Sequence, residues 1–206
     1  MTTIGPAIRA LCIGAGLVLW AGSQIALAQE DADWPCVQRL VPELQPGLVW
    51  SGPALEPVDQ PRPELQEAAR RLIDVKLAPE EITSEVKSFA EQQPEADRAQ
   101  ALTRLFALSF DWLNDERTSV IRDIRHYAAG QKKLADRIVA ETRTLEKLQA
   151  AEPPDTAQIA DLQSSRDWDM RIYGDRQKSL SLVCDQPVQY EQRAFALARI
   201  IQDQLL

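Results

Sequence analysis

The sequence predicts an all-α fold: a helical bundle built on a long antiparallel helical hairpin, with a Pro-rich N-terminal strap. The first observation is that the chain after Pro63 is rich in Ala, Leu, Arg, Gln and Glu, which favour helices. The second is a pair of long, charged segments with apolar stripes, joined at Glu152-Pro153-Pro154-Asp155, which predicts a hairpin over 114–185. The third is the concentration of proline between 33 and 63, which predicts an extended segment there.

The N-terminus has the pattern of a secretory signal peptide. A short start with one positive charge precedes the apolar run Ala10 to Ile25, and Ala26-Leu27-Ala28 supplies a small-x-small cleavage site. We therefore expect a cleaved signal peptide at 1–28, carrying Cys12 away with it. The alternative is a retained membrane anchor, which would need about 20 apolar residues.

The two remaining cysteines, Cys36 and Cys184, are predicted to form a disulfide. Disulfides persist in the exported compartment that the signal peptide implies. The alternative is a pair of free thiols, one of them reactive or metal-binding. No nearby histidine supports a metal site, and no C-x-x-C redox motif is present.

Residues 29–62 are predicted to form a strap that lies over the helices. The spacing of the prolines excludes a long helix or a central strand. Apolar residues, including Trp34, Val49 and Trp50, indicate that the strap packs against something rather than serving as a free linker. The same side chains could instead form an exposed docking patch, so all three are candidate protein-contact residues.

The domain 63–206 is predicted to start with helices over 63–77 and 79–93, each beginning at a proline suited to the first helical turn. A third helix begins at Pro94-Glu95. Its apolar stripe continues past Asn114 without a change of phase, which favours continuity with the hairpin, whereas Asn114 or Asp115 as an N-cap would favour a break. We expect continuity or a mild kink. A last packed helix, which includes Phe195, follows Pro187.

The register of the hairpin follows from its turn: facing residues should have numbers that sum to about 305. This register pairs Leu134 with Met170 and places Trp168 as a core anchor on a charged arm; Trp168 is also a candidate protein-contact residue. Gly130 and Gly174 fall at equal height. Close packing of the arms and a shared flexing point both explain the two glycines. Because each arm is longer than the neighbouring helices, we expect a solvated two-helix paddle that extends from a compact body.

Charge limits the partners. The net charge is −8, and removal of 1–28 would delete Arg9 and no acidic residue, which makes the mature chain more negative by one. Such a chain repels phosphate backbones and anionic lipids. We therefore expect no nucleic-acid partner and no membrane span after signal cleavage.

Motifs for catalysis are absent from the sequence. It contains no G-x-S-x-G, phosphate-binding glycine loop, H-E-x-x-H or C-x-x-C-H. The single histidine, His126, is predicted to lie on a helix surface or to be half-buried with its polar atoms satisfied. The acidic cluster around Asp111 lacks the glycine and the oxygen spacing of a calcium loop. We expect no cofactor, no metal and no enzymatic activity.

Two functional hypotheses follow. The first is an exported, periplasmic, non-catalytic protein that acts through contacts with another envelope protein, as an adaptor, assembly factor or chaperone-like protein, with homo-oligomers possible through the hairpin. The second is a periplasmic sensor that holds a ligand or cofactor in the helical body near Phe106, Phe110, Trp112 and Tyr127. An enzyme using Glu116 or Asp111 is a remaining alternative.

Overall fold

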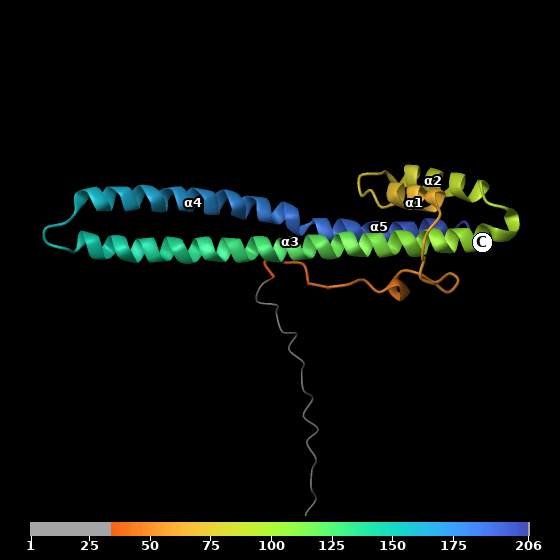
Figure 1. The fold of residues 1–206 in the computed structure, drawn as a ribbon, viewed down its shortest axis with the longest axis horizontal. Helices are drawn as coiled ribbons and strands as arrows, with labels where there is room; N and C mark the ends of the chain where they lie inside the picture. Colours follow the sequence, from red (N-terminus) through yellow and green to blue (C-terminus); the bar gives the residue numbers. More distant parts are fainter. Residues whose placement is uncertain (1–33, 206) are drawn as a thin grey trace, which may run out of the picture. The chain divides into compact units, whose positions relative to one another are not determined.

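The structure, a computed structural model, describes residues 34–205, which belong to one compact unit (Figure 1). The predicted signal peptide, its cleavage site and Cys12 lie outside the described residues. The helices are α1 (Pro63–Leu72), α2 (Pro79–Glu91), α3 (Arg98–Gln149), α4 (Thr156–Cys184) and α5 (Gln186–Gln202), with short 3-10 turns η1 (Pro46–Leu48) and η2 (Glu95–Asp97). The part of the chain that the structure describes contains no strand, so the all-α prediction is confirmed.

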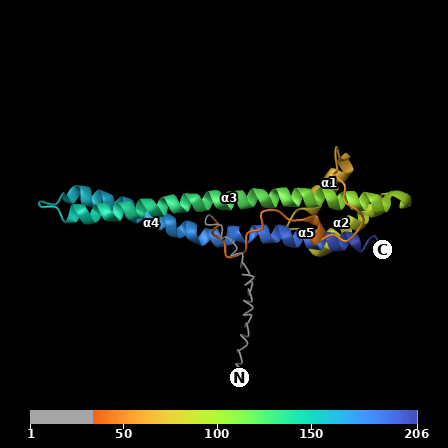
Figure 2. The ribbon, with the colours of Figure 1, turned by 90° about the horizontal axis from the view of Figure 1, so that it is seen from below.

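Helix α3 is the element around which the others pack. It runs for 52 residues without a break, which corresponds to about 78 Å at 1.5 Å per residue. Helices α4 and α5 follow one another along its side, and Figures 1 and 2 show the same arrangement from two directions. The predicted continuity past Asn114 is confirmed. Asn114 does not cap a helix; its Oδ1 atom accepts a hydrogen bond from the backbone N–H of Leu44 at 2.9 Å.

Helix α1 ends at Leu72, five residues before the predicted end at Leu77. The Asp74 carboxylate accepts a hydrogen bond from the backbone N–H of Lys76 at 2.9 Å, a local turn that competes with the helix. The carbonyl of Leu77 instead accepts a hydrogen bond from Arg193 of α5 at 2.6 Å. The residues after Leu72 therefore tie α1 to α5 rather than extend α1.

Helices α2 and α4 begin as their sequences suggest. The Glu81 carboxylate accepts a hydrogen bond from the backbone N–H of Ala78 at 2.8 Å, at the start of α2. At the start of α4, the Asp155 side chain accepts one from the backbone N–H of Gln158 at 3.0 Å. Helix α2 ends at Glu91, close to the predicted end at Gln93.

The register of the α3–α4 hairpin agrees with the prediction. Gln131 donates to the carbonyl of Tyr173 at 3.2 Å, Ser165 donates to Glu141 at 3.0 Å, and Arg137 forms an ion pair with Asp169. The residue numbers of all three pairs sum to within one of the predicted 305. The choice of inward-facing side chains, however, was partly wrong, because Asp169 is buried while Trp168 is 58% exposed and Met170 is 53% exposed.

The two hairpin glycines do not mediate close packing. A Cβ atom built on Gly130 or Gly174 would meet no heavy atom within 4 Å. The arms are therefore not brought together by the absence of a side chain at these positions, and the close-packing interpretation is wrong. A shared flexing point stays a prediction.

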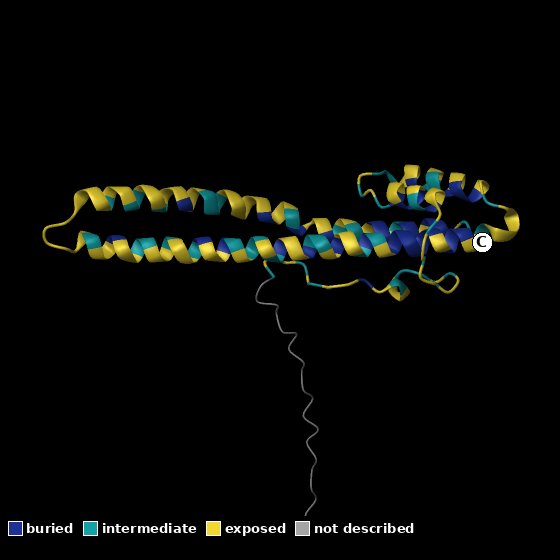
Figure 3. Ribbon diagram, viewed as in Figure 1, coloured by how far each residue is buried: buried dark blue, intermediate teal, exposed yellow. Residues whose placement is uncertain are grey.

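The hydrophobic core lies where α1, α2 and α5 pack around the first half of α3 (Figure 3). Phe106, Leu113 and Leu197 are among its fully buried side chains. Beyond that body, burial becomes sparse: α4 has three buried residues, Asp169, Leu180 and Cys184. Within residues 34–205, the outer hairpin is thus a largely solvated pair of helices, as expected for a paddle.

The strap, residues 34–62 in the described part, crosses α3 and α5. The Cys36–Cys184 disulfide is present, with Cα atoms 5.6 Å apart, and attaches the strap where α4 meets α5. In Figure 1 most of the strap lies on the opposite side of α3 from α1 and α2. The proline-rich strip and the helices therefore form a single folded unit.

Candidate functional site

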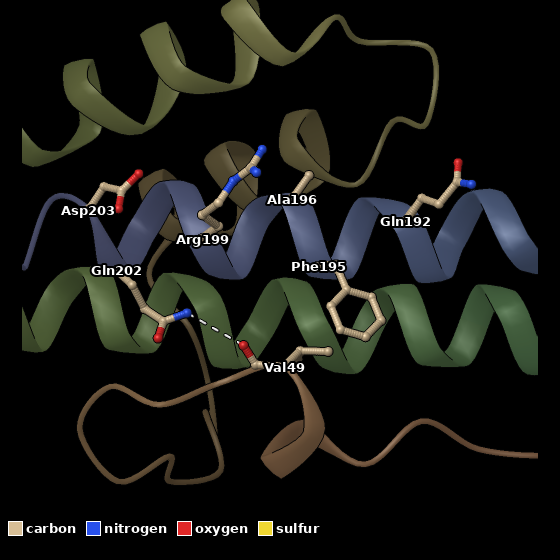
Figure 4. Close-up of a pocket in the computed structure, with 7 residues that line it drawn as sticks. All are labelled: Val49, Gln192, Phe195, Ala196, Arg199, Gln202 and Asp203. Atoms are coloured by element: carbon tan, nitrogen blue, oxygen red, sulfur yellow. Dashed lines mark hydrogen bonds between the residues drawn. The ribbon is translucent and has the colours of Figure 1, made fainter.

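A groove lies along the exposed face of α5 and contains an exposed aromatic side chain, Phe195. The groove volume is about 660 Å³, and Figure 4 shows the residues around it. Five of them recur at helical spacing on α5, one caps the end of that helix, and the last comes from the strap: Gln192, Phe195, Ala196, Arg199, Gln202, then Asp203, then Val49.

Phe195 is on the groove because the core uses another face of α5. Ala194, Leu197, Ala198 and Ile201 are buried against the rest of the body. Phe195 lies outside that stripe and is 54% exposed. Its ring points from α5 toward the strap, where Val49 forms the facing apolar wall (Figure 4).

Gln202 holds the strap beside the groove. Its side-chain nitrogen donates to the carbonyl of Val49 at 3.4 Å, and its side-chain oxygen accepts from the backbone N–H of Ser51 at 3.1 Å and from the Ser51 hydroxyl. One glutamine thus satisfies polar groups of the strap and keeps Val49 in position. The groove wall depends on this contact.

The polar end of the groove carries both signs of charge. Arg199 lies on the last turn of α5, and Asp203 caps the end of that helix. Within the described range 34–205, no side chain forms an ion pair with Arg199. The groove therefore places the apolar side chains of Phe195 and Val49 beside the positive charge of Arg199. This combination suits the binding of a partner protein's side chain more than it suits catalysis.

The four predicted contact residues have different environments. Val49 lines the groove. Trp50 is packed, with its ring stacked on Phe106 at a centroid distance of 4.2 Å, and its indole N–H donates to the carbonyl of Pro53 at 2.7 Å. Trp34 is half-buried, and its indole N–H donates to the carbonyl of Gln38 at 2.7 Å.

Trp168 is the fourth predicted contact residue and lies on the paddle, away from the groove. The prediction that it anchors the hairpin core is wrong, because its neighbour Asp169 takes the inward position and pairs with Arg137. The Arg171 guanidinium lies over the Trp168 ring at 5.4 Å. The tryptophan therefore remains available on the surface of α4.

Phe195 is the groove residue that the sequence reasoning missed. It was assigned to the packed face of the last helix. The stripe Ala194, Leu197, Ala198 and Ile201 follows the three- and four-residue spacing of one helical face more closely. Phe195 is about 100° away from Ala194 around the helix, and this offset is the signal that could have identified it.

The groups considered for chemistry do not converge on a site. His126 is exposed on α3. Burial, followed by the nearby Asp115 carboxylate, raises the pKa of Asp111. No cluster of three or more potential metal ligands occurs among residues 34–205, and no helix in that range is long and apolar enough to cross a membrane.

Comparison of the chain with protein-family models, with curated proteins and with solved structures finds no match.

Proposed function

We propose that this protein is an exported, non-catalytic helical protein that acts by binding another envelope protein through the α5 groove. The observation that carries the proposal is the exposed ring of Phe195 facing Val49 across a groove with a polar, charged end. An adaptor, an assembly factor and a chaperone-like protein would all act through such a contact.

Phe195 has the properties of an interface anchor. Aromatic side chains that fill a partner's pocket contribute a large share of binding energy, while the surrounding polar rim excludes water. Five groove residues lie on one face of α5 and Asp203 caps its end, so the surface follows the helix. A helix of a partner lying against such a groove is a common recognition mode.

The periplasm is the proposed location. The signal-peptide pattern of residues 1–28 supports export, and the Cys36–Cys184 disulfide is compatible with an oxidising compartment. The strong negative charge supports a protein partner over a nucleic acid. Self-association through the hairpin stays a prediction.

The residues predicted for a sensor pocket are spread along α3. Phe106 is fully buried under Trp50, and Phe110 borders a different small pocket, of about 220 Å³, beside the strap. Tyr127 lies 21 residues farther along the same unbroken helix, which is about 32 Å away. These residues do not surround one cavity, so no observation favours a sensor over a protein-binding role.

Site-specific photo-crosslinking tests the proposal. A photoreactive phenylalanine analogue at position 195 should crosslink to one envelope protein, which mass spectrometry then identifies. The matched control places the same analogue at Val139, an apolar position on the outer face of the paddle that is 48% exposed.

The identified partner is then tested for binding. We expect Phe195→Ala to weaken the complex by about 30-fold, the effect of losing a hot-spot side chain, and Val139→Ala to leave it unchanged. Equal crosslinking at both positions, or equal affinity of both alanine variants, would contradict the proposed site.

A further inference from the structure

Several of the contacts that hold the strap on the helical body are made by its backbone. Arg117 donates to the carbonyl of Val41 at 2.6 Å, and Asn114 accepts from the N–H of Leu44 at 2.9 Å. Farther along the strap, the side-chain oxygen of Gln202 accepts a hydrogen bond from the backbone N–H of Ser51 at 3.1 Å. The surface of α3 and α5 around Arg117, Asn114 and Gln202 therefore forms a binding site for an extended segment, which we call the seat. The protein's own strap occupies it.

Few strap side chains are buried in this seat. Among residues 34–62 only Leu44 is buried, while Val37 is fully exposed and Leu48 is 73% exposed. Trp50 stacks on Phe106, and the partly buried side chains of Val49, Leu55 and Val58 also pack against the core. Segments with few buried apolar side chains open at a lower free energy than the core, so the strap can leave its seat while the helices stay folded.

The hinge between the strap and α1 is strained. Gln60 has a φ of 48°, and it is the one non-glycine residue with positive φ among residues 34–205. This left-handed conformation is unfavourable for a residue that has a side chain. Pro61 and Pro63 follow Gln60, and each proline favours extended backbone in the residue before it. A strained hinge of this kind favours a straightened form in which the strap reaches another molecule.

We propose that two copies of this protein exchange straps, so that each α3–α5 seat is filled by the strap of the other copy. The contacts of Arg117, Asn114 and Trp50 are the same in the closed monomer and in the exchanged dimer. The difference lies in the hinge, where both copies lose the left-handed conformation of Gln60. Exchange of identical segments is a low-cost way to a symmetric dimer because it needs no new contact surface.

The disulfide permits this exchange without net oxidation or reduction. A thiolate from an added monothiol attacks one sulfur of the Cys36–Cys184 bond and forms a mixed disulfide, and the other cysteine leaves as a thiolate. After the straps exchange, the free thiolate of one copy attacks the mixed disulfide on the other copy and releases the monothiol. Two bonds within chains become two bonds between chains, and the monothiol is regenerated.

This inference goes beyond the proposed function and does not depend on it. Strap exchange needs a second copy of the chain and no foreign protein at Phe195. Failure of either test leaves the other intact.

Isotope mixing tests the exchange directly. Isotopically heavy and light forms of the purified protein are mixed at high concentration with a catalytic amount of monothiol, then alkylated and digested. We expect disulfide-linked peptides that join heavy Cys36 to light Cys184, recovered from a covalent dimer on size-exclusion chromatography. Far-UV circular dichroism in the same thiol buffer should show unchanged helicity.

The hinge provides the variant and its matched control. Gln60→Gly removes the strain from both closed monomers, and we expect dimerisation about 100-fold weaker, since each hinge contributes about tenfold. Gln45→Gly makes the same chemical change within the strap, where φ is −97°, and should leave the dimer unaffected. A dimer containing only same-label Cys36–Cys184 peptides, equal effects of the two glycine variants, absence of a dimer, or loss of helicity in the thiol buffer would each overturn the proposal.

Discussion

Replacement of Arg117 by methionine should destabilise the protein far more than replacement of a surface arginine. The Arg117 side chain is 2% exposed, and it donates to the carbonyl of Val41 at 2.6 Å and to Glu191 at 3.0 and 2.5 Å. It therefore joins the strap, α3 and α5 at one point. Methionine keeps most of the apolar stem and removes the charge and its hydrogen bonds.

The magnitude follows from these contacts. Hydrogen bonds to a charged group contribute about 1.5–3 kcal/mol each, and loss of one partner of a buried ion pair costs about 3–5 kcal/mol. Glu191 is 30% exposed and regains water, so the cost falls at the lower end, at about 3 kcal/mol. Arg122, which is exposed on the same helix and bonded to Ser119, provides the control. Arg122→Met should change stability by about 0.5 kcal/mol or less.

Urea unfolding followed by circular dichroism, with the disulfide intact, measures both variants. A double-mutant cycle with Glu191→Gln should give a coupling free energy above about 1 kcal/mol. If Arg117→Met costs no more than Arg122→Met, the guanidinium does not hold the strap to the helices and this account of the body is wrong.

Three further predictions concern the hairpin and the acidic cluster. Replacing either hairpin glycine by alanine should raise the free energy of unfolding by about 0.5–1 kcal/mol, because neither has positive φ and the added Cβ has open space; a lower melting temperature would show that the glycine is needed. Burial and the Asp115 carboxylate raise the pKa of Asp111 above its ordinary value of 3.8. The folded state therefore binds the Asp111 proton more tightly than the unfolded state does, and the free energy of unfolding falls as the pH rises through the raised pKa. Asp111→Asn should therefore be more stable than wild type at neutral pH in urea titrations, and this advantage should vanish below the ordinary pKa; a gain that is the same at every pH would refute the assignment. Hydrogen–deuterium exchange should be faster over 140–165, where only Leu145 is buried, than over 115–130; equal protection would contradict the solvated paddle.

The sequence alone predicted the helix starts, the register of the hairpin and the disulfide, because each depends on a few residues of distinctive type. Prolines mark the starts of α1, α2 and α5, and the Pro-Pro turn determines the register of the hairpin. Cys36 and Cys184 remain as the only possible intrachain pair once 1–28 is removed. Each of these predictions depends on a residue type with few structural options.

Features decided by tertiary contacts were not predictable from periodicity. On α4, positions 168, 170 and 172 are apolar, yet residues two apart cannot share one helical face. The pairing of Asp169 with Arg137 places Trp168 and Met170 on the flanks. Arg117 continues the apolar stripe of α3 as a buried charge because strap carbonyls and Glu191 are there to receive it. The groove has the same kind of origin, since Phe195 faces outward because the buried stripe of α5 runs through Ala194, Leu197 and Ile201 instead.

Intact-mass analysis of protein recovered from the cell envelope, after alkylation without reductant, tests the central claim most directly. The account predicts a chain that lacks residues 1–28 and carries no alkyl group, because Cys36 and Cys184 are joined. A mass that includes the N-terminal segment, or two alkyl groups on the mature chain, would contradict an exported helical body braced by its strap.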